Sequence, residues 1–344
     1  MLAELLPTLV KMGVCLGLLL GVAPIMLWVE RRTCALIQDR PGPNRTGPFG
    51  LLQPLADAVK FFFKQTVVPS GADRPLYLLA PVVAIIPALT TYVVIPFGPE
   101  IELAGRHHRM LVSDADTGVL LLLALASLGV YSLVMAGYAS NNKYSLLGAL
   151  RASAQMISYE LALTLSVLAV LLPAASLRLD AVVTAQQGLW FGFLPRWNLF
   201  PQALGFLVFM VAVFAETNRV PFDLPEAESE LVAGHLTEYG AMRWAMFFMG
   251  EYMAMAALSA LGATLYIGGW SLPGMEFAGL GGALKALAVL GAKVAFCMGV
   301  FVWVRWSLPR VRYDQLMRLG WKVLLPLALA NFVLVAALCV GGVL

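Results

Sequence analysis

The residues best suited to carry chemistry lie in one stretch, residues 216–240, which holds six of the chain's twenty acidic residues. Glu216 ends an apolar run and Glu238 begins the next one. Four carboxylates between them share the stretch with one base, Arg219, and these are Asp223, Glu226, Glu228 and Glu230. Carboxylates this dense beside membrane spans are costly to keep unless protons, ions or a partner use them. The stretch therefore indicates a proton or cation route, or a charged docking surface.

Two more acidic residues lie inside apolar runs. Glu160 falls within residues 155–175 and Glu251 within residues 240–267. An acidic side chain buried in a membrane either pairs with a base or takes up a proton. The bases available as partners are few: Arg151, Arg219, Arg243 and Lys293. Because the acids outnumber these bases, some carboxyl groups are expected to exchange protons as a relay would.

A local structural role would account for part of the acidic stretch. Asp223-Leu224-Pro225-Glu226 fits the start of a helix, with Asp223 as the N-cap and Pro225 in the first turn. Glu226 would then reach back to the backbone of the N-cap residue. This role leaves the other acids unexplained, namely Glu160, Glu216, Glu228, Glu230 and Glu251.

The elements that must position these acids are membrane spans. Only 12% of the residues are charged, against about 25% in soluble domains. Apolar stretches that can cross about 30 Å of hydrocarbon fall near residues 6–29, 76–97, 118–139, 155–175, 201–216, 240–267, 283–304 and 323–344. We therefore expect an all-α polytopic membrane protein with about eight transmembrane helices, forming a single integral membrane domain over residues 1–344. The fifth stretch is short and is expected to need a turn of the acidic segment.

The distribution of Lys and Arg predicts the orientation of these spans. The segments after odd-numbered spans hold fifteen of the 23 basic residues, and those after even-numbered spans hold four. The odd-numbered segments, which include residues 30–75 and the acidic loop of residues 216–240, are therefore predicted to be cytoplasmic. Both termini are then predicted to lie outside. The first span, which contains Lys11, is expected to be retained and not cleaved as a signal.

The first cytoplasmic loop, residues 30–75, contains a predicted amphipathic helix from Leu51 to Val68. Apolar residues recur there at helical spacing, and three charged residues lie roughly opposite: Asp57, Lys60 and Lys64. Such a helix lies at the membrane surface. It forms either an interfacial belt or the doorway for a lipid-soluble substrate.

Other patterns exclude common kinds of site. Gly42 to Gly47 has the spacing of a P-loop, but Pro48 replaces the required lysine, which excludes nucleotide binding there. The four cysteines show no CxxC spacing, so no disulfide framework or iron–sulfur cluster is expected. His107 and His108 are neighbours on a predicted irregular loop and are not expected to share a metal ion. The bases form no single face, so no nucleic-acid partner is expected.

Longer motifs are spread through nearly the whole chain: Glu30-Arg31-Arg32, Asp39-Arg40-x-Gly42-Pro43-Asn44-Arg45, Ala72-Asp73-Arg74-Pro75, Lys143-Tyr144-Ser145, Ser158-Tyr159-Glu160, Ala215-Glu216-Thr217-Asn218-Arg219-x-Pro221-Phe222-Asp223-Leu224-Pro225-Glu226-Ala227-Glu228-Ser229-Glu230 and Arg312-Tyr313-Asp314-Gln315. Together they resemble the H-subunit family of bacterial NADH–quinone oxidoreductase, called subunit 1 in mitochondria. This family is the membrane subunit of respiratory complex I that adjoins the peripheral arm.

The resemblance implies a tilted helix bundle around a quinone cavity that is entered from the bilayer. It implies a quinone-chamber set of residues, which is Arg31, Arg40, Asp57, Lys60, Phe222 and Arg312. It also implies a proton-coupling set, which is Glu160, Glu216, Asp223, Glu226, Glu228 and Glu230 with Arg151 and Arg219 as partners. In this family, the carboxylates of the proton-coupling set couple quinone reduction to proton pumping.

The same resemblance implies the cofactors, partners and location. Quinone is the implied substrate, and FMN and iron–sulfur clusters are implied only in partner subunits. The chain acts as a subunit of an oxidoreductase complex and should have no redox centre or redox activity alone. The implied partners are the other complex I subunits and membrane lipid. The implied location is the bacterial inner membrane, with both termini on the periplasmic side.

Departures from the family pattern and rival functions remain. Gln65-Thr66 stands where acids are common in the family, and Gly234-His235-Leu236-Thr237-Glu238-Tyr239 stands where Gly-Tyr-His-Thr-Glu-Tyr is common, so no role is carried onto His235.

The equivalent subunit of a membrane-bound energy-converting hydrogenase, a rival function, has a similar acidic segment. A stand-alone proton or cation transporter would show internal repeats, and the two halves show none. A purely structural anchor would need no acids within its spans.

Overall fold

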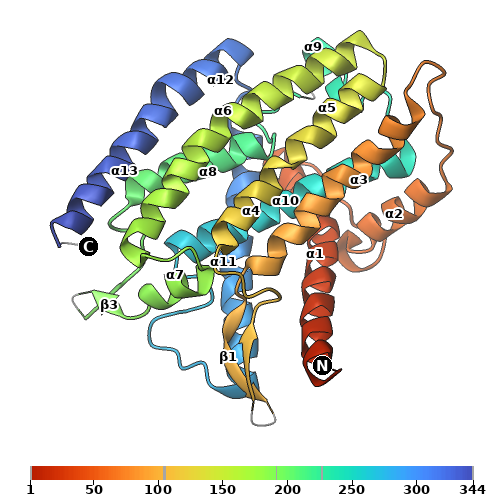
Figure 1. The fold of residues 1–344 in the computed structure, drawn as a ribbon. Helices are drawn as coiled ribbons and strands as arrows, with labels where there is room; N and C mark the ends of the chain where they lie inside the picture. Colours follow the sequence, from red (N-terminus) through yellow and green to blue (C-terminus); the bar gives the residue numbers. More distant parts are fainter. Residues whose placement is uncertain (1, 104–105, 191, 226–227, 343–344) are drawn as a thin grey trace.

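The structure is a computed structural model that describes residues 2–103, 106–190, 192–225 and 228–342 (Figure 1). Helices make up most of it, and the strands form two short antiparallel pairs. Seven helical segments within the described residues are long and apolar enough to cross a membrane. The predicted all-α polytopic membrane class is therefore confirmed.

The first half of the chain contains α1 (Leu2–Ile37), η1 (Pro48–Gly50), α2 (Gln53–Phe63), α3 (Arg74–Thr90), η2 (Thr91–Val94), β1 (Gly98–Leu103), β2 (Arg106–Met110), α4 (Gly118–Ser127), α5 (Gly129–Ala139) and α6 (Lys143–Ala174). The second half contains α7 (Leu179–Ala185), β3 (Leu189–Trp190), β4 (Leu194–Pro195), α8 (Ala203–Glu216), α9 (Glu228–Leu231), η3 (Gly234–Leu236), α10 (Ala241–Tyr266), α11 (Gly279–Ser307), α12 (Tyr313–Leu319), the π turn η4 (Gly320–Leu324) and α13 (Leu325–Val340).

The predicted fifth span is the shortest of the expected helices. α8 has 14 residues, which at 1.5 Å per residue is about 21 Å of helix. The expected extension into the acidic segment was wrong, because the helix ends at Glu216 and Asn218 adopts a left-handed conformation with φ 51°. Asparagine tolerates this conformation better than most residues. The acidic stretch therefore turns away from the helix axis at once.

Two predicted boundaries were also wrong by several residues. α6 begins at Lys143 and not near residue 155, so Arg151 lies inside the helix. The last span is preceded by α12 and η4, which carry helical structure back to Tyr313. In both cases charged residues precede the continuous apolar run, namely Lys143 and Arg151 in α6 and Asp314 and Arg318 in α12, so the hydropathy pattern starts the span after them.

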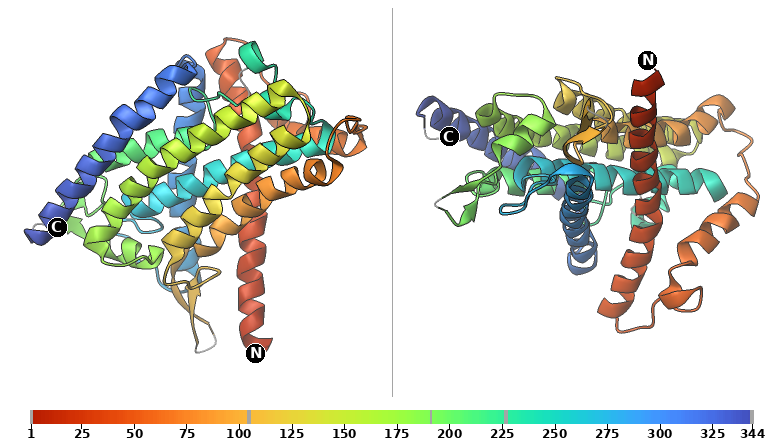
Figure 2. Two further views of the ribbon diagram at one scale, coloured as in Figure 1. Left: turned by 45° about the horizontal axis from the view of Figure 1, so that its top comes forward. Right: turned by 90° about the horizontal axis from the view of Figure 1, so that it is seen from below.

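The long helices form two layers. α3, α5, α6 and α13 run side by side, and α8 and α10 pack behind them (Figures 1 and 2). α1 and α11 run steeply across this second layer, and each contacts α10. The N-terminus and the β1–β2 hairpin lie at one end of the molecule, and α9 lies at the other (Figure 1).

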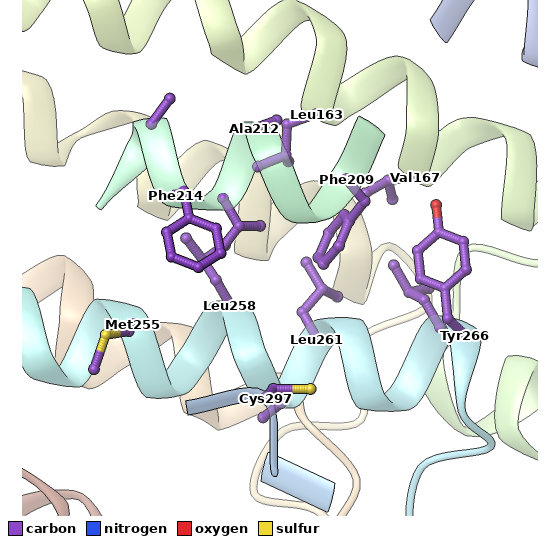
Figure 3. Close-up of a cluster of buried hydrophobic side chains, with 14 of the residues drawn as sticks. Leu163, Val167, Phe209, Ala212, Phe214, Met255, Leu258, Leu261, Tyr266 and Cys297 are labelled. Carbon is purple, nitrogen blue, oxygen red and sulfur yellow. The ribbon is translucent and has the colours of Figure 1, made fainter. Parts of the chain in front are cut away.

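Small residues let α10 occupy the middle of the bundle. A Cβ on Gly262 would lie 2.7 Å from a ring carbon of Phe209 on α8. A Cβ on Gly250 would lie 3.1 Å from the backbone oxygen of Ala84 on α3. Close approach of backbones is the usual way in which membrane helices gain van der Waals contact. The core between α6, α8 and α10 is therefore tightly packed (Figure 3).

The loop after α1 folds back on the end of that helix. The indole nitrogen of Trp28 donates to the backbone oxygen of Phe49 at 3.0 Å, and Arg32 donates to the same oxygen at 3.1 Å. A side chain at Gly50, where φ is 75°, would overlap the backbone of Pro43. The predicted amphipathic helix then follows as α2, which ends at Phe63 and is shorter than the expected range 51–68. Its apolar residues Leu55, Phe62 and Phe63 are exposed, as on a membrane-surface helix.

The loop predicted to be irregular between α3 and α4 is instead a hairpin. β1 and β2 pair antiparallel, with His108 opposite Ile101 and His107 opposite Glu102. Successive residues of a strand point to opposite faces, so the two imidazoles diverge. Among the described residues, no group of three or more His, Cys, Asp or Glu side chains could hold a metal ion.

Candidate functional site

The start of the acidic stretch is held by a single buried amide on α6. The Nε2 atom of Gln155 donates to the backbone oxygens of Ala215 at 2.8 Å and Phe222 at 2.9 Å. It also lies 3.2 Å from the side-chain oxygen of Asn218. These contacts tie both ends of the 215–222 turn to one side chain. The turn therefore presents the side chains between them in fixed directions.

Arg219 is the centre of a buried charge cluster. Its side chain is only 7% exposed, and its guanidinium lies 3.4 Å from a carboxylate oxygen of Glu30 and 2.5 Å from one of Glu251. The ring of Tyr252 lies 4.3 Å below the guanidinium, and the Tyr252 hydroxyl donates to Glu30 at 2.5 Å. Arg305 on α11 forms a further ion pair with Glu30. Two carboxylates and two guanidinium groups thus meet between α1, α10 and α11, where their charges balance.

Glu216 lies beside this cluster and faces a small cavity. The cavity has a volume of about 110 Å³, and both Glu216 and Glu251 line it. Glu216 is 7% exposed, and its Oε2 atom has no hydrogen-bond partner among the described residues. Glu216 therefore has the setting of a carboxyl group that can take up or release a proton to water.

The other acids of the predicted proton-coupling set have separate settings. Arg151 pairs with Glu230 at 2.6 Å, and Asp223 pairs with Arg310 at 3.0 Å. Glu160 is half-buried on α6. Glu226 lies outside the described residues, as does the side chain of Glu228. The predicted N-cap role of Asp223 was wrong, because Leu224 and Pro225 form a turn and not the first residues of a helix.

The predicted partnership of bases and acids is only partly seen in the geometry. Arg151 contacts one member of the predicted set, whereas Arg219 contacts Glu30 and Glu251, which are outside it. Lys293 donates to the backbone oxygens of Ile267, Gly269 and Ser271 at 2.7, 2.8 and 2.7 Å, and so holds the loop that follows α10. Arg243 lies over the ring of Tyr77.

The predicted quinone-chamber residues fall into one close pair and four separate positions. Arg31 at the end of α1 pairs with Asp57 on α2 at 2.6 Å, and Gln53 donates to the same carboxylate at 3.2 Å. Phe222 is buried against Tyr159. The remaining three are Arg40, Lys60 and Arg312, all exposed. Glu30 and Arg31 are adjacent, so one turn of α1 joins the surface helix to the buried cluster.

Sequence reasoning missed several residues that build the site. Glu30, Tyr252 and Arg305 complete the cluster, and Gln155 and Arg310 fix the acidic turn. Glu30 precedes Arg31 at the end of an apolar run, and Tyr252 follows Glu251 in the middle of another. Polar residues at such positions could have indicated a role in the site. Nothing local in the sequence marks Gln155, whose importance depends on the approach of segments 60 residues apart.

The 3-10 turn η3, which carries His235, packs against α6 because Gly148 has no side chain. A Cβ at this position would lie 2.7 Å from the Cα atom of Gly234 and 3.0 Å from the backbone nitrogen of His235. We expect Gly148→Ala to lower the free energy of unfolding by about 1–3 kcal/mol, because backbone atoms must move to accept it. Thermal melting of the detergent-solubilised complex measures the effect. Gly299→Ala, with nothing within 4 Å, is the control, and equal melting temperatures for both variants would contradict the importance of this packing.

The fold and this site define a multi-pass membrane protein with paired charges inside its helix bundle. The model of the NADH dehydrogenase family matches residues 10–336, so the chain belongs to that family. Curated relatives named as the H subunit of NADH-quinone oxidoreductase are similar over most of the chain. The relative from Deinococcus deserti is 50% identical over 97% of this chain and 84% of its own length. The relative from Thermomicrobium roseum is 48% identical over 96% of this chain and 95% of its own length.

A third relative, also named as an H subunit of NADH-quinone oxidoreductase, comes from Geobacter metallireducens. It is 47% identical, over 94% of this chain and 93% of its own length. The predicted resemblance to the H-subunit family is therefore confirmed. The names of all three relatives also agree with the predicted role as a subunit of an oxidoreductase complex.

Proposed function

We propose that the chain is the membrane subunit of a proton-translocating NADH–quinone oxidoreductase that joins the quinone chamber to a proton route through the membrane. The names of its relatives support the oxidoreductase complex. The observation that carries the coupling role is the continuity from Asp57 and Arg31 to Glu30, Arg219 and Glu251, and then to the cavity at Glu216.

The surface end of this path suits a quinone headgroup. Arg31 and Asp57 lie where α1 meets α2, and the exposed apolar residues of α2 would rest in the lipid interface that holds a quinone tail. Reduction of a quinone takes up two electrons and two protons, and the electrons would come from clusters in a partner subunit. FMN in the peripheral arm would supply hydride chemistry there. The residues of this chain orient the headgroup and respond to its change in charge.

The buried end of the path converts that response into a proton shift. The guanidinium of Arg219 lies between the carboxylates of Glu30 and Glu251 and can pair more closely with either of them. A change in charge near Arg31 alters the field at Glu30, one residue away, and thereby the balance between the two pairs. When Arg219 moves toward Glu30, Glu251 loses part of its stabilising charge and binds a proton more readily. A carboxyl group across the cavity, Glu216, can supply that proton through water.

The location and the organisation of the chain follow from the same proposal. The chain forms one integral membrane domain over residues 1–344, in a bacterial inner membrane, with both termini in the periplasm. Residues 30–75 and 216–240 then face the cytoplasm and contact the subunits of the peripheral arm. The excess of Lys and Arg in the segments after odd-numbered spans, taken together, supports this orientation.

The proposal is tested by tagging this chain, purifying the complex that accompanies it, and measuring NADH-driven quinone reduction. We expect activity that quinone-site inhibitors block. Hydrogen evolution or uptake in its place would assign the chain to the energy-converting hydrogenases instead. A lone chain that conducts ions would contradict both functions.

The pair between Arg31 and Asp57 gives a narrower prediction. Asp57→Asn removes the charge that orients Arg31, and we expect the KM for quinone to rise several-fold. Assembly should change little, because a half-exposed ion pair contributes only about 0–1 kcal/mol to stability. Steady-state kinetics on membranes measure the KM, with Lys64→Gln at the exposed end of α2 as the control. An unchanged KM in Asp57→Asn would remove this pair from the quinone site.

A further inference from the structure

The cavity beside Glu216 is lined by a third titratable side chain, His235. It belongs to η3, whereas Glu216 ends α8 and Glu251 lies on α10. At about 110 Å³ the cavity has room for several water molecules, since each occupies about 30 Å³ in the liquid. Carboxylate, imidazole and amide groups around it supply the polar partners that buried water requires. Three neighbouring elements of the chain thus bring three proton-exchanging groups to one cavity that can hold water.

His235 is buried but its ring is only partly engaged. It is 6% exposed, and its ring packs against that of Phe247 in a T-shaped arrangement with 5.7 Å between ring centroids. Its Nδ1 atom has no hydrogen-bond partner among the described residues. A buried imidazole that served only to fill space would normally have both nitrogens satisfied. The Nδ1 atom is therefore expected to form a hydrogen bond with water in the cavity, because no described side chain around it provides one.

We propose that His235 is a proton-exchanging residue that links Glu216 to Glu251 through water in this cavity. The inference rests on the proposed coupling function and names one further group in its proton route. No charged side chain other than Glu216 and Glu251 lines the cavity among the described residues. The neighbouring helices contribute Ala84 from α3, Ser132 from α5 and Met156 from α6. Arg151 on α6 is paired with Glu230 and not with the imidazole.

The exchange conserves both protons and charge. The carboxyl group of Glu216 gives a proton, through water, to one ring nitrogen of His235. The other ring nitrogen releases a proton, through water, to the carboxylate of Glu251. The imidazole is neutral before and after, Glu216 becomes ionised, and Glu251 becomes neutral. The loss of charge on Glu251 frees Arg219 to favour Glu30, which links the exchange to the charge cluster.

The protonation of His235 agrees with this cycle. Burial lowers the pKa of the imidazole to about 4, so the ring is neutral near pH 7. A neutral imidazole carries one N–H and one acceptor nitrogen, so it can accept and donate in one passage. The imidazole of His235 is positively charged only while a proton passes through it, so no proton stays bound there beside the ion pairs.

Chemical rescue tests the proposal on the intact complex. His235→Ala opens space for a small ring, and we expect coupled NADH–quinone turnover per assembled complex to fall about tenfold or more. Added imidazole should restore a large part of that turnover. Pyrrole has nearly the same shape but cannot accept a proton at neutral pH, and it should restore none. His107→Gln in the β1–β2 hairpin is the control for loss of an exposed histidine.

The outcomes separate this inference from the function on which it rests. Rescue of turnover by imidazole and not by pyrrole supports the relay. Turnover is expressed per assembled complex, so the test works even if only part of the variant assembles. Equal rescue by both rings, or full turnover without either, would show a packing role only and overturn the inference. Glu216→Gln is measured alongside. If it loses turnover while His235→Ala does not, only the role of His235 fails; if Glu216→Gln is also fully active, the coupling function fails as well.

Discussion

Replacing Arg219 with methionine is expected to lower the stability of the folded subunit by about 3–5 kcal/mol, because breaking a buried ion pair leaves charge without compensation. The guanidinium is shared by Glu30 and Glu251, and its side chain is 7% exposed. Methionine keeps an unbranched side chain but supplies neither charge nor cation–π contact with Tyr252. The assembled complex should be strongly depleted on native gels, and what remains should melt at lower temperature.

Two further variants make this expectation specific. Arg312→Met removes a guanidinium whose side chain is 74% exposed, and it should leave assembly unchanged. The double variant Arg219→Met/Glu251→Gln removes one carboxylate together with its cation and should recover part of the lost stability. Normal assembly of the Arg219→Met single variant would show that the cluster is not held together by this charge.

Glu216→Gln is expected to produce the second large effect, on turnover and not on assembly. The amide has the same shape as the carboxyl group but cannot exchange a proton with water in the cavity. A positioned proton-transfer group typically contributes 10²–10⁴-fold to a rate, so we expect coupled turnover to fall by about tenfold or more. NADH–quinone reductase activity is measured in membranes and divided by NADH oxidation with an artificial acceptor, which needs only the peripheral arm.

The exposed Glu276 provides the matched control for this variant. Glu276→Gln makes the same chemical change outside the cavity and should keep full turnover. If Glu216→Gln lost turnover and assembly in equal proportion, Glu216 would have a structural role. If it kept full turnover, the proton route would not pass through this residue.

The sequence predicts the spans well where hydropathy alone decides them. The sixth predicted span, residues 240–267, is α10 at Ala241–Tyr266. Prediction placed the start of α6 too late, because Lys143 and Arg151 interrupt the apolar pattern although the helix already begins at Lys143. It also failed for the hairpin of residues 98–110, since a two-stranded pair has little apolar signal of its own.

The candidate site was predictable in composition but not in pairing. The count of acids and bases singled out residues 216–240 as a candidate stretch, and Glu216 lines a cavity in the structure. The partners of Arg219 were not predictable, because Glu30 lies 189 positions earlier in the chain. His235 was set aside because its place in the motif is unusual. The turn that carries it lies close to Gly148 on α6, a contact that only the fold reveals.

The central claim is that carboxyl exchange in this chain couples quinone reduction to proton movement. Its most direct test is acidification of liposomes that contain the purified complex, during NADH oxidation by quinone. Wild-type complex is slowed by limiting NADH until its electron-transfer rate equals that of Glu216→Gln. We expect the wild type to acidify the lumen and the variant, at the same electron-transfer rate, to acidify it far less. Equal acidification by the two complexes would contradict the claim.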